Sequence, residues 1–141
     1  TLQWQVELKD RLGIPSAVWL SNKKVWQDQN GHIIKTRGAS DITRCPTAIA
    51  IVSTGLIFHM SAEREELLKV RYGTVVLDEG HKARTSRTLG TDAGEANNLL
   101  EFMLQIGPRT KHLLIGTATP IQTSVDELWD LLKILNAGAE F

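Results

Sequence analysis

The amino-acid sequence predicts an α/β fold with three layers, in which an open, mostly parallel sheet carries helices on both faces. The first observation behind this is that short apolar runs rich in β-branched residues alternate along the chain with segments of helical periodicity. Such alternation favours parallel strands joined by right-handed crossovers. The second is size, since 141 residues with 42% apolar side chains suffice for one packed core. We therefore expect one domain over residues 1–141.

Four segments are expected to form strands because they are short, apolar and suited to a pleated sheet. They are residues 14–20, 47–53, 74–78 and 111–117. We expect the first two to be buried and the last two to be central parallel strands. Between the first two, Asn30-Gly31 is the favoured pair for a type I′ turn and has apolar residues on either side. A surface hairpin inserted around residues 23–36 is therefore expected.

Three segments have the spacing of an amphipathic helix. In the first, residues 2–12, the stripe expected to pack is Trp4, Leu8 and Leu12. The second stripe, which Gly107-Pro108 ends, is Ala96, Leu99, Leu100, Met103 and Leu104. The third follows a capping box at Ser124–Glu127, and its stripe is Val125, Leu128, Trp129, Leu132 and Leu135. Thr85–Gly94 is rich in Thr, Ser and Gly, so we expect a mobile loop around residues 82–94.

Composition and charge exclude several classes of protein. The formal net charge is +0 with 23% charged residues, so neither a polybasic tail nor an acidic disordered segment is present. No apolar stretch approaches the roughly 18 residues of a membrane span, and the start is neither a signal peptide nor an initiator methionine. We expect a soluble, cytoplasmic protein that makes no membrane contact and is cut from something longer.

The cysteine, histidine and tryptophan residues give little indication of a disulfide, a zinc site or base stacking. Cys45 is alone and cannot form an internal disulfide, and the four histidines are too scattered for zinc. Trp4 and Trp129 lie on apolar helical faces and Trp19 in a strand, which favours core packing over base stacking. Only Trp26, in the hairpin, stays open as a stacking candidate.

Two adjacent carboxylates, Asp78 and Glu79, directly follow four β-forming residues, Thr74–Leu77, of which the last three are apolar. Carboxylates at the end of a buried strand are costly to hold without a cation or donors to balance them. In an open parallel sheet, ligands gather at the carboxyl ends of the strands. A nucleotide site would use this arrangement, because Mg²⁺ takes a few carboxylates together with waters and phosphate oxygens. The alternative is that the pair simply opens a solvated loop.

Val76-Leu77-Asp78-Glu79-Gly80-His81 resembles motif II of superfamily two helicases, the DEAH-type Walker B box, with Gly80 where alanine is usual. Glycine is smaller and is expected only to loosen the backbone there. Further motifs of that family occur in family order over nearly the whole chain. Residues 114–122 resemble motif III, and residues 128–132 are similar to the segment after motif III in Swi/Snf-type motors. Residues 3–8 look like the end of motif Ia, and residues 51–54 resemble motif Ib.

The resemblance implies a fragment of the first RecA-like motor domain of a Swi/Snf-type, ATP-driven DNA translocase. Asp78 would hold Mg²⁺ through water, and Glu79 would orient and polarise the water that attacks ATP. His81, Thr117 and Thr119 would link the nucleotide state to domain closure. The alternative for the two threonines is that they satisfy a strand end and prepare the turn at Pro120.

The same resemblance implies contacts with duplex DNA. Ser53 and Thr54 would meet the DNA backbone, and they could equally cap the helix expected over residues 55–60, since a cap also offers amide donors to phosphate. Lys82, Arg84 and Arg87 form a basic run after the box that is either a solvated loop or a phosphate-binding segment.

Two parts of such a motor are missing from the sequence. No segment reads Gly-x-x-x-x-Gly-Lys-Ser/Thr, so the phosphate-gripping Walker A loop is absent and the domain is expected to be truncated at its N-terminal end. The second RecA-like domain, which supplies arginine fingers in the family, is also absent. We expect the fragment alone to be inactive. Two alternatives remain open: a catalytically inert docking or regulatory module, and a metal-dependent nuclease.

Overall fold

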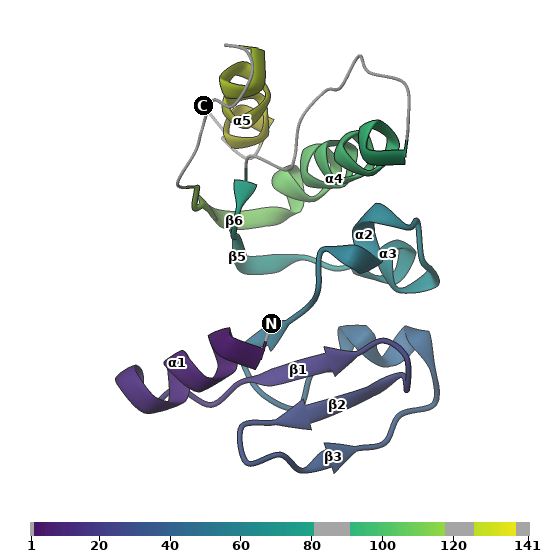
Figure 1. Ribbon diagram of the computed structural model, residues 1–141, viewed down its shortest axis with the longest axis vertical. Helices are drawn as coiled ribbons and strands as arrows, with labels where there is room; N and C mark the ends of the chain where they lie inside the picture. Colours follow the sequence, from purple (N-terminus) through teal and green to yellow (C-terminus); the bar gives the residue numbers. More distant parts are fainter. Residues whose placement is uncertain (1, 81–90, 118–125, 138–141) are drawn as a thin grey trace. The chain divides into compact units, whose positions relative to one another are not determined.

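The structure is a computed structural model, which describes residues 2–80, 91–117 and 126–137 (Figure 1). The predicted α/β class is confirmed, because helices and strands are mixed and each of the two sheets contains a parallel pair. Contacts divide the chain into two compact units. Unit 1 is Thr1–Leu56 with Ser61–Leu67, and unit 2 is Ile57–Met60 with Leu68–Phe141. The single domain over the whole chain stays a prediction.

Unit 1 is built on a four-stranded sheet (Figure 1). Its elements are α1 (Leu2–Leu12), β1 (Ala17–Leu20), β2 (Val25–Asp28), β3 (Ile33–Ile34), the 3-10 helix η1 (Ala39–Thr43), β4 (Ala50–Ile51) and α3 (Ala62–Leu67). The strand order is β3-β2-β1-β4, with β1 antiparallel to β2 and parallel to β4. The short α2 (Gly55–Phe58) crosses the boundary between the units.

The segment predicted as a buried strand over residues 47–53 forms only the two-residue β4, and neither of its residues is buried. The reason is its place in the sheet. An edge strand has one neighbour, so half of its backbone groups and much of its surface stay open.

The predicted hairpin is confirmed, because β2 pairs antiparallel with β3, but its turn is not type I′. That turn needs a positive φ at both central residues. Gly31 has φ 82, whereas Asn30 is not among the residues with positive φ. The Gly31 N–H donates to the Asp28 carbonyl and the Asp28 N–H to the His32 carbonyl, so three residues form the loop and glycine supplies the left-handed position at its end.

The core of unit 1 is centred on Trp19 and Trp26, whose rings meet edge to face with centroids 5.1 Å apart. Trp26 is 1% exposed, and its ring N–H donates to the Asp41 carbonyl at 3.1 Å. The burial predicted for Trp19 is confirmed. The view of Trp26 as an open stacking candidate is wrong, because β2 lies between β1 and β3 and its inner face is covered.

Helix α1 forms at its predicted bounds, but the predicted packed face is wrong. Trp4 is 44% exposed and Leu12 66% exposed, whereas Gln5 is buried. The Gln5 side-chain amide donates to the carbonyls of Ser16 and Gln27, both at 3.0 Å. These backbone oxygens need donors once they leave water, so a polar residue holds this helix to the sheet.

Unit 2 holds β5 (Tyr72–Leu77), α4 (Thr91–Ile106), the 3-10 helix η3 (Gly107–Arg109), β6 (Thr110–Ile115) and α5 (Asp126–Ala137). β5 and β6 pair in parallel, as predicted. Their apolar residues are less buried than expected: Val76 and Leu114, which face each other in register, are 53% and 59% exposed. In the described part of the chain this sheet has two strands, so neither strand is central.

Helix α4 buries Leu99, Leu100 and Met103, which confirms the predicted stripe at these positions, and it ends at Ile106 just before Gly107-Pro108. The helix begins at Thr91, so the last four residues of the predicted loop are helical. The rest of that loop, residues 82–90, lies outside the described residues, as does the capping residue Ser124.

Helix α5 exists as predicted but packs a different face. Leu131 and Ile134 are buried, whereas Trp129, Leu132 and Leu135 are 60%, 43% and 41% exposed. Apolar residues occupy more than half of its circumference, so periodicity alone does not decide which of two stripes turns inward. No helix in the described ranges is long and apolar enough to cross a membrane.

Burial predicts that the same substitution destabilises the chain far more at Trp26 than at Trp4. In the 141-residue chain, Trp26→Ala should lower the free energy of unfolding by about 3–5 kcal/mol, because it empties the core of unit 1. Trp4→Ala should cost about 1 kcal/mol or less, because much of that ring stays in water. Urea denaturation followed by far-UV circular dichroism measures both. If Trp26→Ala does not fold, Trp26→Phe takes its place, and equal losses at the two positions would contradict the described core.

Candidate functional site

Asp78 and Glu79 follow the last residue of β5 directly. Leu77, the end of the strand, is buried, and the next two side chains are exposed. Glu79 has a left-handed backbone with φ 53, which it shares with only two other non-glycine residues of the described ranges, Lys24 and Met60. A non-glycine residue in this region costs on the order of 1–2 kcal/mol, so other interactions must hold it there.

The ends of β5 and β6 are tied together beyond the strand ladder. Leu77 faces Ile115 in register. The Gly116 N–H then donates to the Leu77 carbonyl, and the Gly80 N–H donates to the Gly116 carbonyl, each at 2.9 Å. These bonds lie on either side of Asp78 and Glu79, so the two carboxylate residues form a turn clamped onto the end of β6.

Of the three residues predicted to link the nucleotide state to domain closure, Thr117 lies in the described part of the chain, next to these hydrogen bonds. Thr117 follows Gly116 directly and is half-buried, so it lies at the same end of the same sheet as Asp78. A Cβ added at Gly116 would lie 3.7 Å from Asp78 Oδ1, which shows that this carboxylate lies over the end of β6. His81 and Thr119, the other two residues of the predicted link, lie outside the described residues, so the link stays a prediction.

Gly80 is buried where β5, β6 and α5 meet. A Cβ at this position would lie 2.3 Å from Ile115 Cγ2 and 3.4 Å from Leu131 Cδ2. The first distance is far shorter than any real contact, and the branched Ile115 side chain is stiff within a strand. The expectation that glycine only loosens the backbone here is wrong, because the structure fills the space that an alanine methyl would need.

The donor chemistry at this turn fits a hard divalent cation. Asp78 and Glu79 offer exposed carboxylate oxygens, which are the protein ligands that Mg²⁺ takes, with waters and phosphate oxygens completing its shell. Within the described residues, no three His, Cys, Asp or Glu side chains gather at one point.

Ser53 and Thr54 belong to unit 1, after β4, and the local geometry of Ser53 supports the capping role. Ser53 Oγ accepts a hydrogen bond from the Gly55 N–H at 3.2 Å, and the Ser53 carbonyl accepts one from the Leu56 N–H. Lys82, Arg84 and Arg87 lie outside the described residues. The predicted DNA contacts of all five residues therefore stay predictions.

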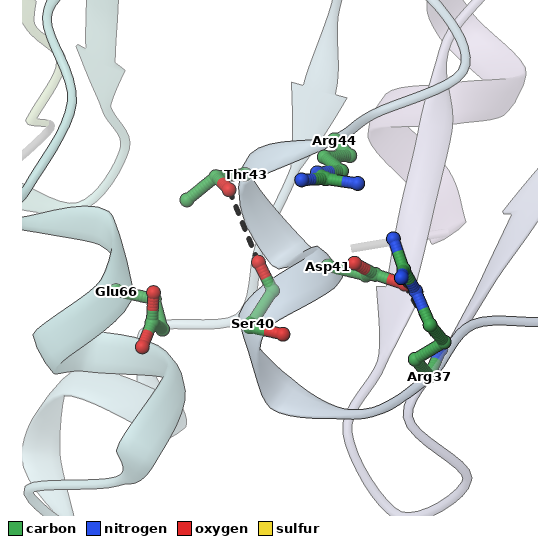
Figure 2. A pocket seen from close by; sticks show the side chains of 6 residues that line it. All are labelled: Arg37, Ser40, Asp41, Thr43, Arg44 and Glu66. Carbon is green, nitrogen blue, oxygen red and sulfur yellow. Dashed lines mark hydrogen bonds and ion pairs between the residues drawn. The ribbon is translucent and has the colours of Figure 1, made fainter.

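Unit 1 also carries a hollow of about 350 Å³ between η1 and α3 that sequence reasoning missed (Figure 2). It is lined by Arg37, Ser40, Asp41, Thr43, Arg44 and Glu66. The Arg37 N–H donates to Asp41 Oδ2 at 2.9 Å, and Thr43 Oγ1 donates to the Ser40 carbonyl at 3.0 Å. No sequence signal could have found it, because the segment has neither periodicity nor a motif.

Sequence comparison places these features in a known context. The model of the family described as SNF2-related domain matches residues 3–139. The uncharacterized ATP-dependent helicase YqhH of Bacillus subtilis (strain 168) is 28% identical over 136 residues, which cover 96% of this chain and 19% of that protein. No solved structure matches the chain.

Two eukaryotic relatives match over shorter stretches. Protein CHROMATIN REMODELING 5 of Arabidopsis thaliana is 36% identical over 76 residues, 54% of this chain and 4% of that protein. DNA repair protein RAD5 of Eremothecium gossypii is 25% identical over 115 residues, 75% of this chain and 10% of that protein. The chain thus spans a small part of each relative. Because the family model covers nearly all of its residues, the chain belongs to the SNF2-related domain family.

Proposed function

We propose that this chain is part of an intracellular, DNA-dependent ATPase that moves along duplex DNA, with its hydrolysis site at the turn after β5. The observation that carries the proposal is the exposed Asp78-Glu79 pair, clamped by two hydrogen bonds onto the end of β6 in a chain of the SNF2-related domain family. Relatives named as an ATP-dependent helicase, a chromatin-remodelling protein and a DNA repair protein support the choice of ATP and DNA.

The two carboxylates have different tasks in this proposal. Asp78, whose carboxylate lies over Gly116, orients the hydration shell of a Mg²⁺ ion bound to ATP. That ion supplies charge stabilisation to the phosphates during transfer. Glu79 accepts a hydrogen bond from the attacking water and polarises it toward the terminal phosphate. The left-handed backbone at Glu79 turns its side chain away from the direction that a continuing strand would give it.

In this proposal, the phosphate-binding loop and the second RecA-like domain of the ATPase are supplied by other parts of the parent protein. No Gly-x-x-x-x-Gly-Lys-Ser/Thr segment is present, so the phosphates need a loop contributed by more of the parent protein. A second RecA-like domain would supply the cation for the transition state. Ser53, Thr54, Lys82, Arg84 and Arg87 are proposed to contact the DNA backbone, where contacts to phosphate position the protein without reading sequence.

Replacing one carboxylate tests the hydrolysis site. In the full-length parent, Glu79→Gln should leave ATP binding near normal and lower turnover by about 10²–10⁴-fold, since it keeps the shape and removes the base. Steady-state ATPase assays and calorimetric titration with Mg-ATP measure the two quantities. Glu101→Gln is the matched control, because Glu101 is exposed on α4. If turnover survives Glu79→Gln within a few-fold, Glu79 is not the water-orienting residue and the assignment of the hydrolysis site is wrong.

Coupling between motif II and motif III is tested by a double-mutant cycle in the same parent. We propose that His81 passes the nucleotide state to Thr117 or Thr119 through a hydrogen bond. His81→Ala and the Thr117→Ala, Thr119→Ala pair should each lower the ratio of translocation rate to ATP turnover, and their combination should add little. His112→Ala, at an exposed position of β6, is the control. Fully additive losses would remove this link from the mechanism.

A further inference from the structure

At the end of β5, the strained left-handed backbone conformation occurs at Glu79 and not at the neighbouring Gly80. Glu79 has φ 53, whereas Gly80 lies outside the left-handed range that glycine tolerates freely. A turn that only reversed the chain would put glycine at the left-handed position. Strained residues persist only where their surroundings over-determine them, and they cluster at functional sites. The glycine must therefore serve another purpose.

That purpose is close packing. Gly80 is buried, and its N–H is held by the Gly116 carbonyl at 2.9 Å. The space where its side chain would stand is taken by Ile115 Cγ2 from β6 and by Leu131 Cδ2 from α5. Leu131 is 5% exposed, so it is fixed by its own packing. Side chains from β6 and α5 therefore pack closely around Gly80, the residue that follows Glu79.

We propose that Ile115 and Leu131 are positioning residues for the hydrolysis step, which hold Gly80 against β6 and thereby aim the Glu79 carboxylate. The proposal rests on the function proposed above for Glu79. This role requires neither side chain to contact nucleotide or water. Their effect passes through the Gly80 backbone, so a shift of α5 at Leu131 changes the rate of the chemical step without changing the nucleotide contacts.

The expected size of the effect follows from geometry. Displacing a catalytic group by about 1 Å can lower the rate by about 10²-fold even when the substituted residue is remote. Loss of positioning in the transition state lowers kcat and kcat/KM together, whereas loss of general binding raises KM. A role in stability alone would change the amount of folded enzyme and leave kcat per folded molecule unaltered.

The first experiment adds and then relieves the clash in the full-length parent. Gly80→Ala should lower kcat per folded enzyme at least about 10-fold with little change in the KM for ATP, because the new methyl meets Ile115 Cγ2. Ile115→Ala removes Cγ2 and makes room for the methyl added at Gly80, which then packs against β6 in its place. The double variant should therefore recover most of the lost kcat. If Gly80→Ala keeps full turnover, or if Ile115→Ala restores nothing, the proposal is wrong.

The second experiment needs no variant at Gly80 and separates positioning from folding. Leu131→Ala and Ile134→Ala each remove a buried aliphatic side chain of α5, but only Leu131 is among the nearest neighbours of Gly80. Leu131→Ala should lower kcat per folded enzyme about 10-fold, and Ile134→Ala should leave it within about 2-fold. Equal losses in kcat would overturn the role of Leu131.

Glu79→Gln, assayed in parallel, distinguishes failure of this proposal from failure of the proposed function. If Glu79→Gln abolishes turnover while Gly80→Ala and Leu131→Ala leave it intact, Glu79 is the water-orienting residue and its aim does not depend on this packing. If turnover survives Glu79→Gln, the proposed function itself fails and the positioning role falls with it.

Discussion

The two hydrogen bonds that join the ends of β5 and β6 are the constraint on which the candidate site depends. Through them, the Leu77 and Gly80 backbones are tied to Gly116, so Asp78 and Glu79 must bulge from the end of the strand pair. Each such hydrogen bond contributes about 0.5–1.5 kcal/mol to stability. Two of them together offset the cost of about 1–2 kcal/mol of the left-handed backbone at Glu79. The clamp converts an ordinary strand end into a turn whose backbone is held at both ends.

The same constraint explains the residues behind the turn. Drawing Gly80 toward the Gly116 carbonyl brings it against Ile115, where no Cβ fits, and α5 closes the space from another direction through Leu131. The candidate site thus depends on contacts between β5, β6 and α5, which are far apart in sequence. This is why glycine is suited to position 80, where no larger side chain would fit.

Much of this could be predicted from the sequence, because the helices of residues 2–12 and 96–104, the hairpin and the parallel pair follow from local periodicity and turn chemistry. Burial could not be predicted so well. Trp26 is buried because a third strand follows it, and Gln5 rather than Trp4 faces the sheet because two backbone carbonyls need donors. The strain at Glu79 and the packing at Gly80 leave no trace in residue type, because both arise from contacts with Gly116, Ile115 and Leu131.

The central claim is that the clamped turn after β5 aims Glu79 at the water that attacks ATP. A crystal structure of the full-length parent with Mg-ADP and a transition-state analogue of the terminal phosphate tests it most directly. We predict a Glu79 carboxylate oxygen about 2.6–3.2 Å from the attacking water, with the Gly80 N–H still bonded to the Gly116 carbonyl. A Glu79 carboxylate turned away from the phosphate, or a turn released from β6 in that state, would contradict it.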